Sequence, residues 1–147
     1  MKLFLISLLS FSLVSCGGSG HIMLYNFNAP KYDVHKEILD VINKDSTYTV
    51  PKKWIEVAKE AKEAGDGLEY FFLYFKHKPE EMYEMQFADS ASWNNSLKSS
   101  LGLNSRFDGH FWKYGKDLSS KENERITKRF EDEILSKLKY GFEKSYY

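Results

Sequence analysis

Apolar residues recur every three or four positions in three segments of the chain, which is the spacing of one face of an amphipathic helix. The first two predicted helices cover residues 33–45 and 51–64, and Pro51 suits a first helical turn because an N–H there has no helical partner. The third covers residues 120–140, after Ser119, which with a glutamate three positions later forms a capping-box signal. The pattern therefore predicts two N-terminal helices and one long C-terminal helix.

The first of two predicted β-hairpins joins residues 68–76 to residues 81–88. A register that pairs Tyr70 with Phe87 makes one face of this hairpin entirely apolar or aromatic. That face carries Tyr70, Phe72, Tyr74, Tyr83, Met85 and Phe87. Because the first strand is apolar on both faces, we expect it at the centre of the sheet, and we expect the alternating second strand to be half-exposed.

The second predicted hairpin turns at Asp108-Gly109, a strong two-residue turn signal because both central positions of a type I′ turn need positive φ. Its register pairs Phe107 with His110. The resulting apolar face carries Leu101, Leu103, Ser105, Phe107, His110, Trp112 and Tyr114. A slip by one residue would mix the apolar and polar sets, so the turn chemistry and the hydrophobic pattern predict the same register.

A further strand is predicted over residues 21–27, ahead of the first helix. The order of elements is then strand, helix, helix, about four antiparallel strands and a long helix. Because each element must bury its apolar face against another, this order predicts a two-layer α+β domain over residues 21–147. We expect an antiparallel sheet of about four to five strands, with the long C-terminal helix packed on its aromatic face.

Aromatic residues make up 16% of the chain, with ten tyrosines and eleven phenylalanines. Tyrosine suits positions where one end is buried and the other is wet. A candidate aromatic binding face consists of Tyr70, Phe72, Tyr74, Trp112 and Tyr114. The ordinary interpretation is that this face is core beneath the last helix, and the alternative is an apolar cavity or contact surface. The C-terminal aromatics either pack back on the domain or contact a partner: Tyr140, Phe142, Tyr146 and Tyr147.

The N-terminus combines one positive charge at Lys2 with an apolar run over residues 3–14, interrupted only by serines. A helix over this run is roughly 18 Å long, short of the ~30 Å hydrocarbon core of a bilayer. A charged start, a short apolar centre and a small residue before a cleavage site are typical of a secretory signal.

The end of this segment, Leu13-Val14-Ser15-Cys16, resembles the lipobox of bacterial lipoproteins. The resemblance implies that residues 1–15 are a signal peptide removed by cleavage and that the sulfur of Cys16 receives a diacylglycerol. The new amino group would then be acylated, for example with palmitate. The alternative is an ordinary secretory signal with a chance cysteine near its end. Lipidation agrees with cysteine usage, because this is the one cysteine of the chain.

Residues 16–20 would then be the lipidated cysteine and a flexible Gly/Ser tether. Two or three acyl chains hold a protein on a bilayer far more firmly than a single chain does. So short a tether keeps the domain against the membrane surface. We therefore expect a lipid-anchored protein of the bacterial cell envelope, and we favour the outer membrane over the inner.

The composition and the motifs argue against several other classes of function. The 21 basic and 21 acidic side chains give a net charge of zero, which offers no footprint for nucleic acid. One cysteine excludes a disulfide framework or a CxxC site, and the four histidines form no HExxH pair. No GxSxG nucleophile motif is present. We therefore predict no metal, no cofactor and no catalysis.

Two small groups of polar residues are weak candidates for chemistry. Arg106, Asp108 and His110 lie close in sequence and suggest an acid–base site, although a turn explains Asp108 equally well. The acidic residues Glu80, Glu81 and Glu84 suggest a cation site, although a solvated strand edge is the ordinary explanation.

These observations predict a membrane-anchored envelope lipoprotein that acts as a non-catalytic binding module, such as an accessory subunit or an immunity-type protein. Its partners would be the membrane and another envelope protein. The alternative is a carrier of a small apolar ligand, held in a cavity between sheet and helix, and an enzyme of unknown type comes third.

Overall fold

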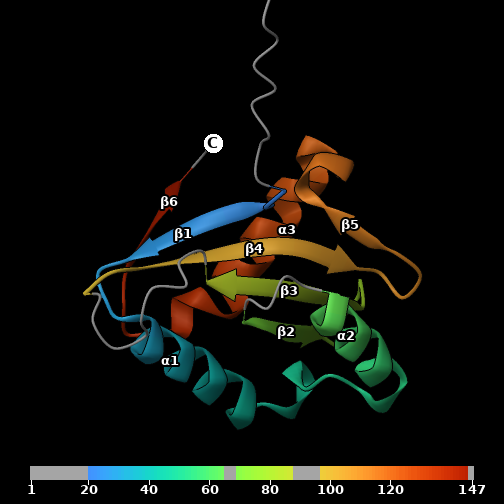
Figure 1. Cartoon of the computed structure of the whole chain (residues 1–147), viewed down its shortest axis with the longest axis horizontal. Coiled ribbons are helices and arrows are strands. Elements are labelled where there is room, and N and C mark those ends of the chain that lie inside the picture. The colour runs from blue at the N-terminus through green and yellow to red at the C-terminus, as the bar shows by residue number, and fades with distance from the viewer. Residues whose placement is uncertain (1–19, 65–68, 88–96, 146–147) are drawn as a thin grey trace, which may run out of the picture.

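Six strands form one antiparallel sheet in the computed structural model, which describes residues 20–64, 69–87 and 97–145 (Figure 1). The strands are β1 (Met23–Phe27), β2 (Tyr70–Phe75), β3 (Glu81–Phe87), β4 (Ser99–Phe107), β5 (Trp112–Tyr114) and β6 (Phe142–Ser145). They lie in the order β2–β3–β4–β1–β6, and β5 pairs with the end of β4. The α+β class is confirmed, but the sheet has six strands rather than the expected four to five, and helices pack on both of its faces rather than in the predicted two layers.

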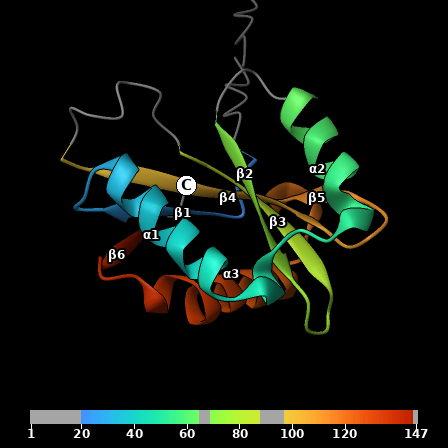
Figure 2. The same ribbon diagram turned by 90° about the horizontal axis from the view of Figure 1, so that it is seen from below.

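The helices of the described residues lie on both sides of this sheet. They are α1 (Lys31–Lys44), α2 (Lys52–Ala64) and α3 (Ser120–Glu133), with short 3-10 turns at Ser46–Tyr48, Gly115–Asp117 and Leu135–Lys137. Figure 2 shows α3 and α2 on opposite sides of the sheet. We call these the α3 side, which α1 also covers, and the α2 side. None of the described helices has the length and apolarity that a bilayer crossing needs.

The main core lies on the α3 side, where Val34, Ile126 and Phe130 of the helices pack against Tyr25 and Tyr83 of the sheet. A smaller cluster on the α2 side consists of Trp54, Tyr74, Met82 and Phe107. The predicted helices at residues 33–45 and 51–64 are therefore confirmed, but each buries only part of its predicted apolar stripe, because Leu39 of α1 and Ile55 of α2 are exposed.

The predicted register of the first hairpin is wrong by one residue. Tyr70 lies opposite Gln86 rather than Phe87, which exchanges the two faces of β3 relative to β2. Phe71, Leu73 and Phe75 of β2 therefore join Tyr83, Met85 and Phe87 of β3 on the α3 side. The other β2 residues face α2 beside Met82, Glu84 and Gln86. This register is stable because the polar side chains of β3 find hydrogen-bond partners on β4.

The expected positions of the two strands are also reversed. β2 is an edge strand, whereas β3 lies inside the sheet and all seven of its residues are buried. β2 is apolar on both faces because ring systems cover it from both sides. Tyr48 packs on Phe75 at a ring-centroid distance of 5.8 Å, and Trp54 packs on Tyr74 at 5.3 Å.

The second hairpin has a four-residue loop instead of the predicted two-residue turn, because Phe107 pairs with Trp112. Asp108 still nucleates the loop: its Oδ1 accepts hydrogen bonds from the backbone N–H groups of His110 and Phe111. Gly109 has a φ of 96°, as the Asp-Gly signal indicated. The loop is longer by two residues, so the same side chains of the two strands still point to the same face. Phe107, Trp112 and Tyr114 therefore share the α2 side with Ser105.

A β-bulge in β4 divides the face that the sequence had suggested was continuous. Glu84 pairs with Ser105, but Met85 pairs with Leu103, so Asn104 is the extra residue. Leu101 and Leu103 consequently belong to the main core, whereas Phe107 packs in the cluster on the α2 side. The prediction that these four odd-numbered positions share one face is therefore wrong.

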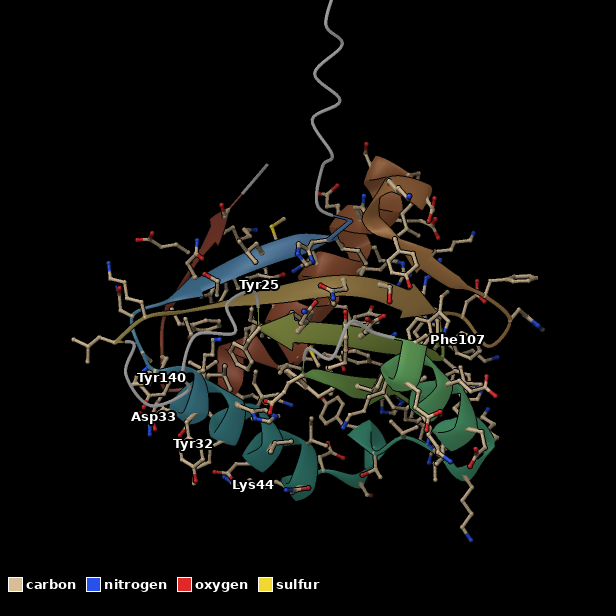
Figure 3. All side chains as sticks on the ribbon, viewed as in Figure 1. Tyr25, Tyr32, Asp33, Lys44, Phe107 and Tyr140 are labelled. Carbon is tan, nitrogen blue, oxygen red and sulfur yellow. The ribbon has the colours of Figure 1, made fainter. Side chains whose placement is uncertain are left out.

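The last predicted helix is shorter than expected. Ser119 caps α3 by accepting a hydrogen bond from the Glu122 N–H at 3.2 Å, but the helix ends at Glu133. The chain then adds strand β6, whose Phe142 lies 5.4 Å from Tyr25 between ring centroids. Tyr140 packs against the main core and reaches toward α1 (Figure 3). Tyr140 and Phe142 therefore pack back on the domain, while residues 146–147 lie outside the described residues.

Candidate functional site

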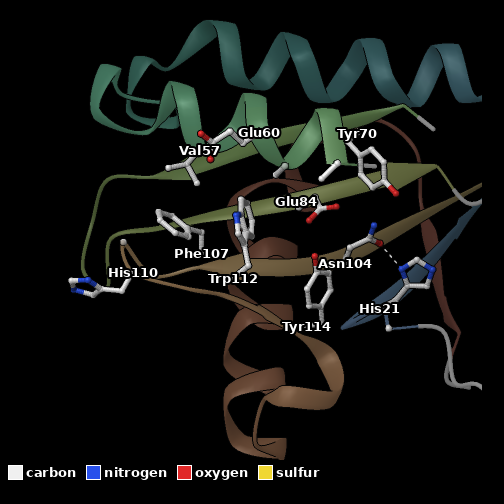
Figure 4. Close-up of a pocket in the computed structure, with 14 residues that line it drawn as sticks. His21, Val57, Glu60, Tyr70, Glu84, Asn104, Phe107, His110, Trp112 and Tyr114 are labelled. Atoms are coloured by element: carbon white, nitrogen blue, oxygen red, sulfur yellow. Dashed lines mark hydrogen bonds between the residues drawn. The ribbon is translucent and has the colours of Figure 1, made fainter. Parts of the chain in front are cut away.

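A groove of about 900 Å³ lies on the α2 side of the sheet (Figure 4). One wall is the small-residue stripe of α2, with Val57, Ala61 and Ala64. The opposite wall and the floor come from β2, β3, β4 and β5, and the rim includes Gly20 and His21 at the start of the described chain. The Cys16 and lipobox predictions fall in residues 1–19, outside the described residues.

Aromatic rings from three strands line this groove. Tyr70 of β2, Phe107 of β4, and Trp112 and Tyr114 of β5 contribute to it. Trp112 is supported by Phe107, at a ring-centroid distance of 5.2 Å, and by Phe72 at 5.9 Å. The groove is open to solvent rather than enclosed.

The five residues of the candidate aromatic face thus all lie on the α2 side of the sheet, but only some of them line the groove. Tyr70, Trp112 and Tyr114 line the groove, Phe72 supports Trp112, and Tyr74 packs beneath Trp54. The ordinary interpretation, that this face is core beneath the last helix, is wrong because α3 packs on the opposite side. The chain order of the elements did not indicate which helix would cover which side.

A row of buried polar side chains crosses the floor of the groove. The Ser105 hydroxyl donates a hydrogen bond to Glu84 Oε2 at 2.6 Å, and Asn104 Nδ2 donates one to Gln86 Oε1 at 3.1 Å. His21 Nδ1 lies in hydrogen-bond contact with Asn104 Oδ1, an amide oxygen that can only accept. The bulge at Asn104 makes the row possible, because it turns two successive residues of β4 toward the groove.

Two glycines allow the N-terminal segment to lie along this row. A Cβ at Gly102 would stand 2.8 Å from Asn104 Oδ1 and 2.9 Å from His21 Nδ1. A Cβ at Gly115 would overlap the His21 carbonyl oxygen. The segment is held by backbone hydrogen bonds, because Ile22 N donates to the Leu103 carbonyl at 2.7 Å and Gly115 N donates to that of Gly20.

Burial dominates the electrostatics of the groove. It raises the pKa of Glu84, against the opposing hydrogen bonds from Ser105 and Asn104. Burial also raises the pKa of Tyr114, and the nearby charge of Glu84 adds to that effect. Glu60 of α2 places a second carboxyl group at the groove, and among the described residues that line it there is no lysine or arginine.

The predicted acidic group does not form one site. Glu80 lies at the β2–β3 turn and pairs with Lys53 at 2.6 Å. Glu81 and Glu84 are buried on opposite sides of the sheet, so the expectation of a solvated strand edge is wrong for both. No group of three or more His, Cys, Asp or Glu side chains that could hold a metal ion occurs in residues 20–64, 69–87 and 97–145.

The second weak candidate also separates in space. Arg106 Nη1 pairs with Asp108 at 2.7 Å, and its Nη2 pairs with Glu122 of α3 at 3.0 Å. Arg106 therefore faces the α3 side, whereas His110 lines the groove. Asp108 has the role that the turn explanation assigned to it.

Comparisons of the chain with protein-family models, with curated proteins and with solved structures found no match. The class of site is therefore defined by its geometry: an open groove with aromatic walls and a buried polar floor, on one side of an antiparallel α+β sheet.

Proposed function

We propose that the protein is a lipid-anchored lipoprotein of the bacterial cell envelope and that it acts as a non-catalytic binding module through the groove on the α2 side. One observation carries this proposal: the groove rim includes Gly20 and His21, where the chain arrives from the lipobox-like segment. The four residues that follow Cys16, Gly17 to Gly20, extend to at most about 14 Å. A lipidated Cys16 would therefore hold the groove close to the bilayer.

The chemistry of the groove suits binding rather than catalysis. The polar side chains of its floor are engaged with one another, as Glu84 is with Ser105 and Asn104 is with His21. Such a row fixes the positions of its members and presents them to a ligand. Exposed aromatic side chains that border a pocket are the typical anchors of protein–protein contacts. An envelope protein is the partner that an accessory subunit or an immunity-type protein would have.

The second candidate function is a carrier of a small apolar ligand. The volume of about 900 Å³ lies within the range of small-molecule sites, and rings form much of the wall. A carrier encloses its ligand, whereas this groove is open to solvent. This observation favours the binding module.

The test compares two tryptophan substitutions on the same helix. Ala61→Trp fills the groove, whereas Lys59→Trp adds the same ring at an exposed position of α2. We expect the wild-type protein and Lys59→Trp to co-purify the same envelope protein from solubilised membranes and Ala61→Trp to lose it. Equal recovery by the two variants would contradict a role for the groove.

The anchor is tested separately with Cys16→Ala. We expect this variant to accumulate as an uncleaved precursor without acyl mass, as measured by mass spectrometry of the intact protein. Normal cleavage and membrane retention of Cys16→Ala would contradict the lipoprotein assignment and leave the result for Ala61→Trp unaffected.

A further inference from the structure

Glu84 is a buried acidic side chain within an aromatic groove. Only 6% of its surface is exposed, and Figure 4 shows its carboxyl group between the rings of Tyr70, Trp112 and Tyr114. Its hydrogen-bond donor Ser105 is neutral. A buried carboxylate is stable when a cation compensates it, and otherwise it resists ionisation.

The described lining of the groove holds no lysine or arginine, and the charge of His21 offsets only part of the effect that burial has on the pKa of Glu84. Glu60 adds a second carboxyl group, and the histidine closest to the floor, His21, is tied to Asn104. Aromatic faces attract cations through the negative charge of their π-systems, and the attraction increases when water is excluded. The groove therefore combines two features that complement a positive group: acidic side chains and ring faces.

We propose that the groove binds an organic ammonium group, held against Glu84 and over the rings of Tyr70, Trp112 and Tyr114. This assignment rests on the proposed binding role of the groove and adds a small ligand to the protein partner proposed there. The apolar wall formed by Val57, Ala61 and Ala64 accommodates the hydrocarbon part of the same ligand. A metal ion fits less well, because the described residues bring no group of three or more His, Cys, Asp or Glu side chains together that could hold one.

Two sources carry this chemistry. A soluble quaternary amine is one, and the headgroup of a choline or ethanolamine lipid is the other. Both place a positive nitrogen at the end of an otherwise uncharged group. The experiment therefore starts from the shared group and then separates the sources.

The first measurement compares choline with 3,3-dimethyl-1-butanol, which has the same shape without the charge. Calorimetric titrations use the full chain in a non-ionic detergent. We expect choline to bind at least roughly tenfold more tightly than its neutral counterpart, because only the cation gains from the ring faces and the carboxylate. Equal affinities, or no binding of either probe, would overturn the assignment.

Two variants locate the effect. Glu84→Gln keeps an acceptor for Ser105 and removes the charge, and it should lose most of the preference for choline. Trp112→Leu should weaken choline more than the neutral probe. Tyr32→Leu, at a side chain 59% exposed on α1, is the matched control and should change neither affinity. Thermal unfolding of each variant establishes that it is folded.

The pH dependence gives a second readout. The cation stabilises the ionised carboxyl group, so choline affinity should rise with pH through the raised pKa of Glu84. The other titratable groups of the groove are Glu60, His21, His110, Tyr70 and Tyr114. A rise that disappears in Glu84→Gln belongs to Glu84, whereas an identical rise in that variant would contradict the proposal.

Vesicles then separate the two sources of the ammonium group. Competition with choline by phosphatidylcholine vesicles, and not by phosphatidylglycerol vesicles, would identify a lipid headgroup. If choline binds and neither vesicle competes, the ligand is a soluble ammonium compound. If the two probes bind equally while Ala61→Trp still loses the partner protein, the ammonium assignment fails and the binding role remains.

Discussion

Glu81 and Glu84 lie on the same strand, and both are almost completely buried, but their surroundings differ. Glu81 is 2% exposed and faces the α3 side, where Arg125 Nη1 and Arg129 Nη1 donate to it at 3.0 Å and 3.2 Å. Arg106 Nε lies 3.6 Å from the same carboxylate. Glu84 faces the α2 side, where the neutral Ser105 hydroxyl is a donor to it.

The difference shows how the two sides of the sheet are used. On the α3 side the ion network attaches the helix to the sheet, because Arg129 also donates to the backbone carbonyls of His77 and Pro79 at the β2–β3 turn. Its guanidinium lies 4.5 Å from the centre of the Phe75 ring. The charge of Glu81 is thus satisfied within the fold, whereas the described lining of the groove brings no lysine or arginine to Glu84, and burial raises its pKa despite the charge of His21.

The largest effect is expected for Glu81→Gln. This change leaves buried guanidinium groups without their shared counter-charge, so the free energy of unfolding should fall by about 3–5 kcal/mol. Urea denaturation measures it. Asp132→Asn, which removes an exposed partner of Lys128 on the same helix, should have no measurable effect. A loss for Glu81→Gln as small as that of its control would show that the two sides do not differ.

The next effect concerns the path of the chain at the groove rim. In Gly115→Ala the new methyl group would overlap the His21 carbonyl oxygen, so we expect a loss of about 1–3 kcal/mol and faster exchange of the Ile22 amide proton. Gly141→Ala is the control, because nothing lies within 4 Å of the added Cβ. Equal stability of the two variants would mean that the segment is not held against Gly115.

Local signals predicted the elements well, because each depends on neighbouring residues. The cap at Ser119 and the loop at Asp108 are both present, and they require only backbone groups two or three positions away. The C-terminal strand was missed because the apolar repeat at Ile134 and Leu135 resembles a continuing helix, whereas Ile134 is the buried C-cap of α3 and Leu135 is buried from the 3-10 turn that follows.

The register and the site depended on distant partners, which the pattern could not reveal. β2 is apolar at every position, so a slip by one residue changes nothing in its own hydrophobic pattern. Glu84 and Gln86 are accommodated by Ser105 and Asn104, and this pairing depends on a bulge that has no local sequence signature. The alternation of side chains along β5 correctly predicted that Trp112 and Tyr114 share one face.

The pH dependence of stability gives a smaller effect, with a sign that distinguishes Glu84. Because burial raises the pKa of Glu84 in the folded protein, the folded state binds more protons than the unfolded chain above the ordinary carboxyl range. Its contribution to stability is therefore unfavourable and grows as the pH rises from that range through the raised pKa.

Glu84→Gln removes this contribution. The variant should be as stable as the wild type at low pH and relatively more stable as the pH rises, when denaturation midpoints are compared across pH without ligand. Glu122→Gln, at a partly exposed carboxyl group on the α3 side, should not show this pattern. A Glu84→Gln variant that became relatively less stable with rising pH would mean that Glu84 already has a compensating cation in the folded protein.

The smallest effect concerns Glu80, a partly exposed carboxyl group that lies close in sequence to the buried residues Glu81 and Glu84. Its pKa is lowered mainly by the hydrogen bond from Lys53, and a bond from Tyr74 adds to this, while burial and Glu80 raise the pKa of Tyr74 to about 12. A lowered folded pKa stabilises the protein above the ordinary carboxyl range, and this gain is lost as the pH falls through the folded value.

Lys53→Gln should cost less than about 1 kcal/mol, because water screens this pair. Carbon-detected NMR titration should show the pKa of Glu80 rising in Lys53→Gln and unchanged in Lys52→Gln; no rise in the first variant would mean that Tyr74 alone sets the ionisation of Glu80.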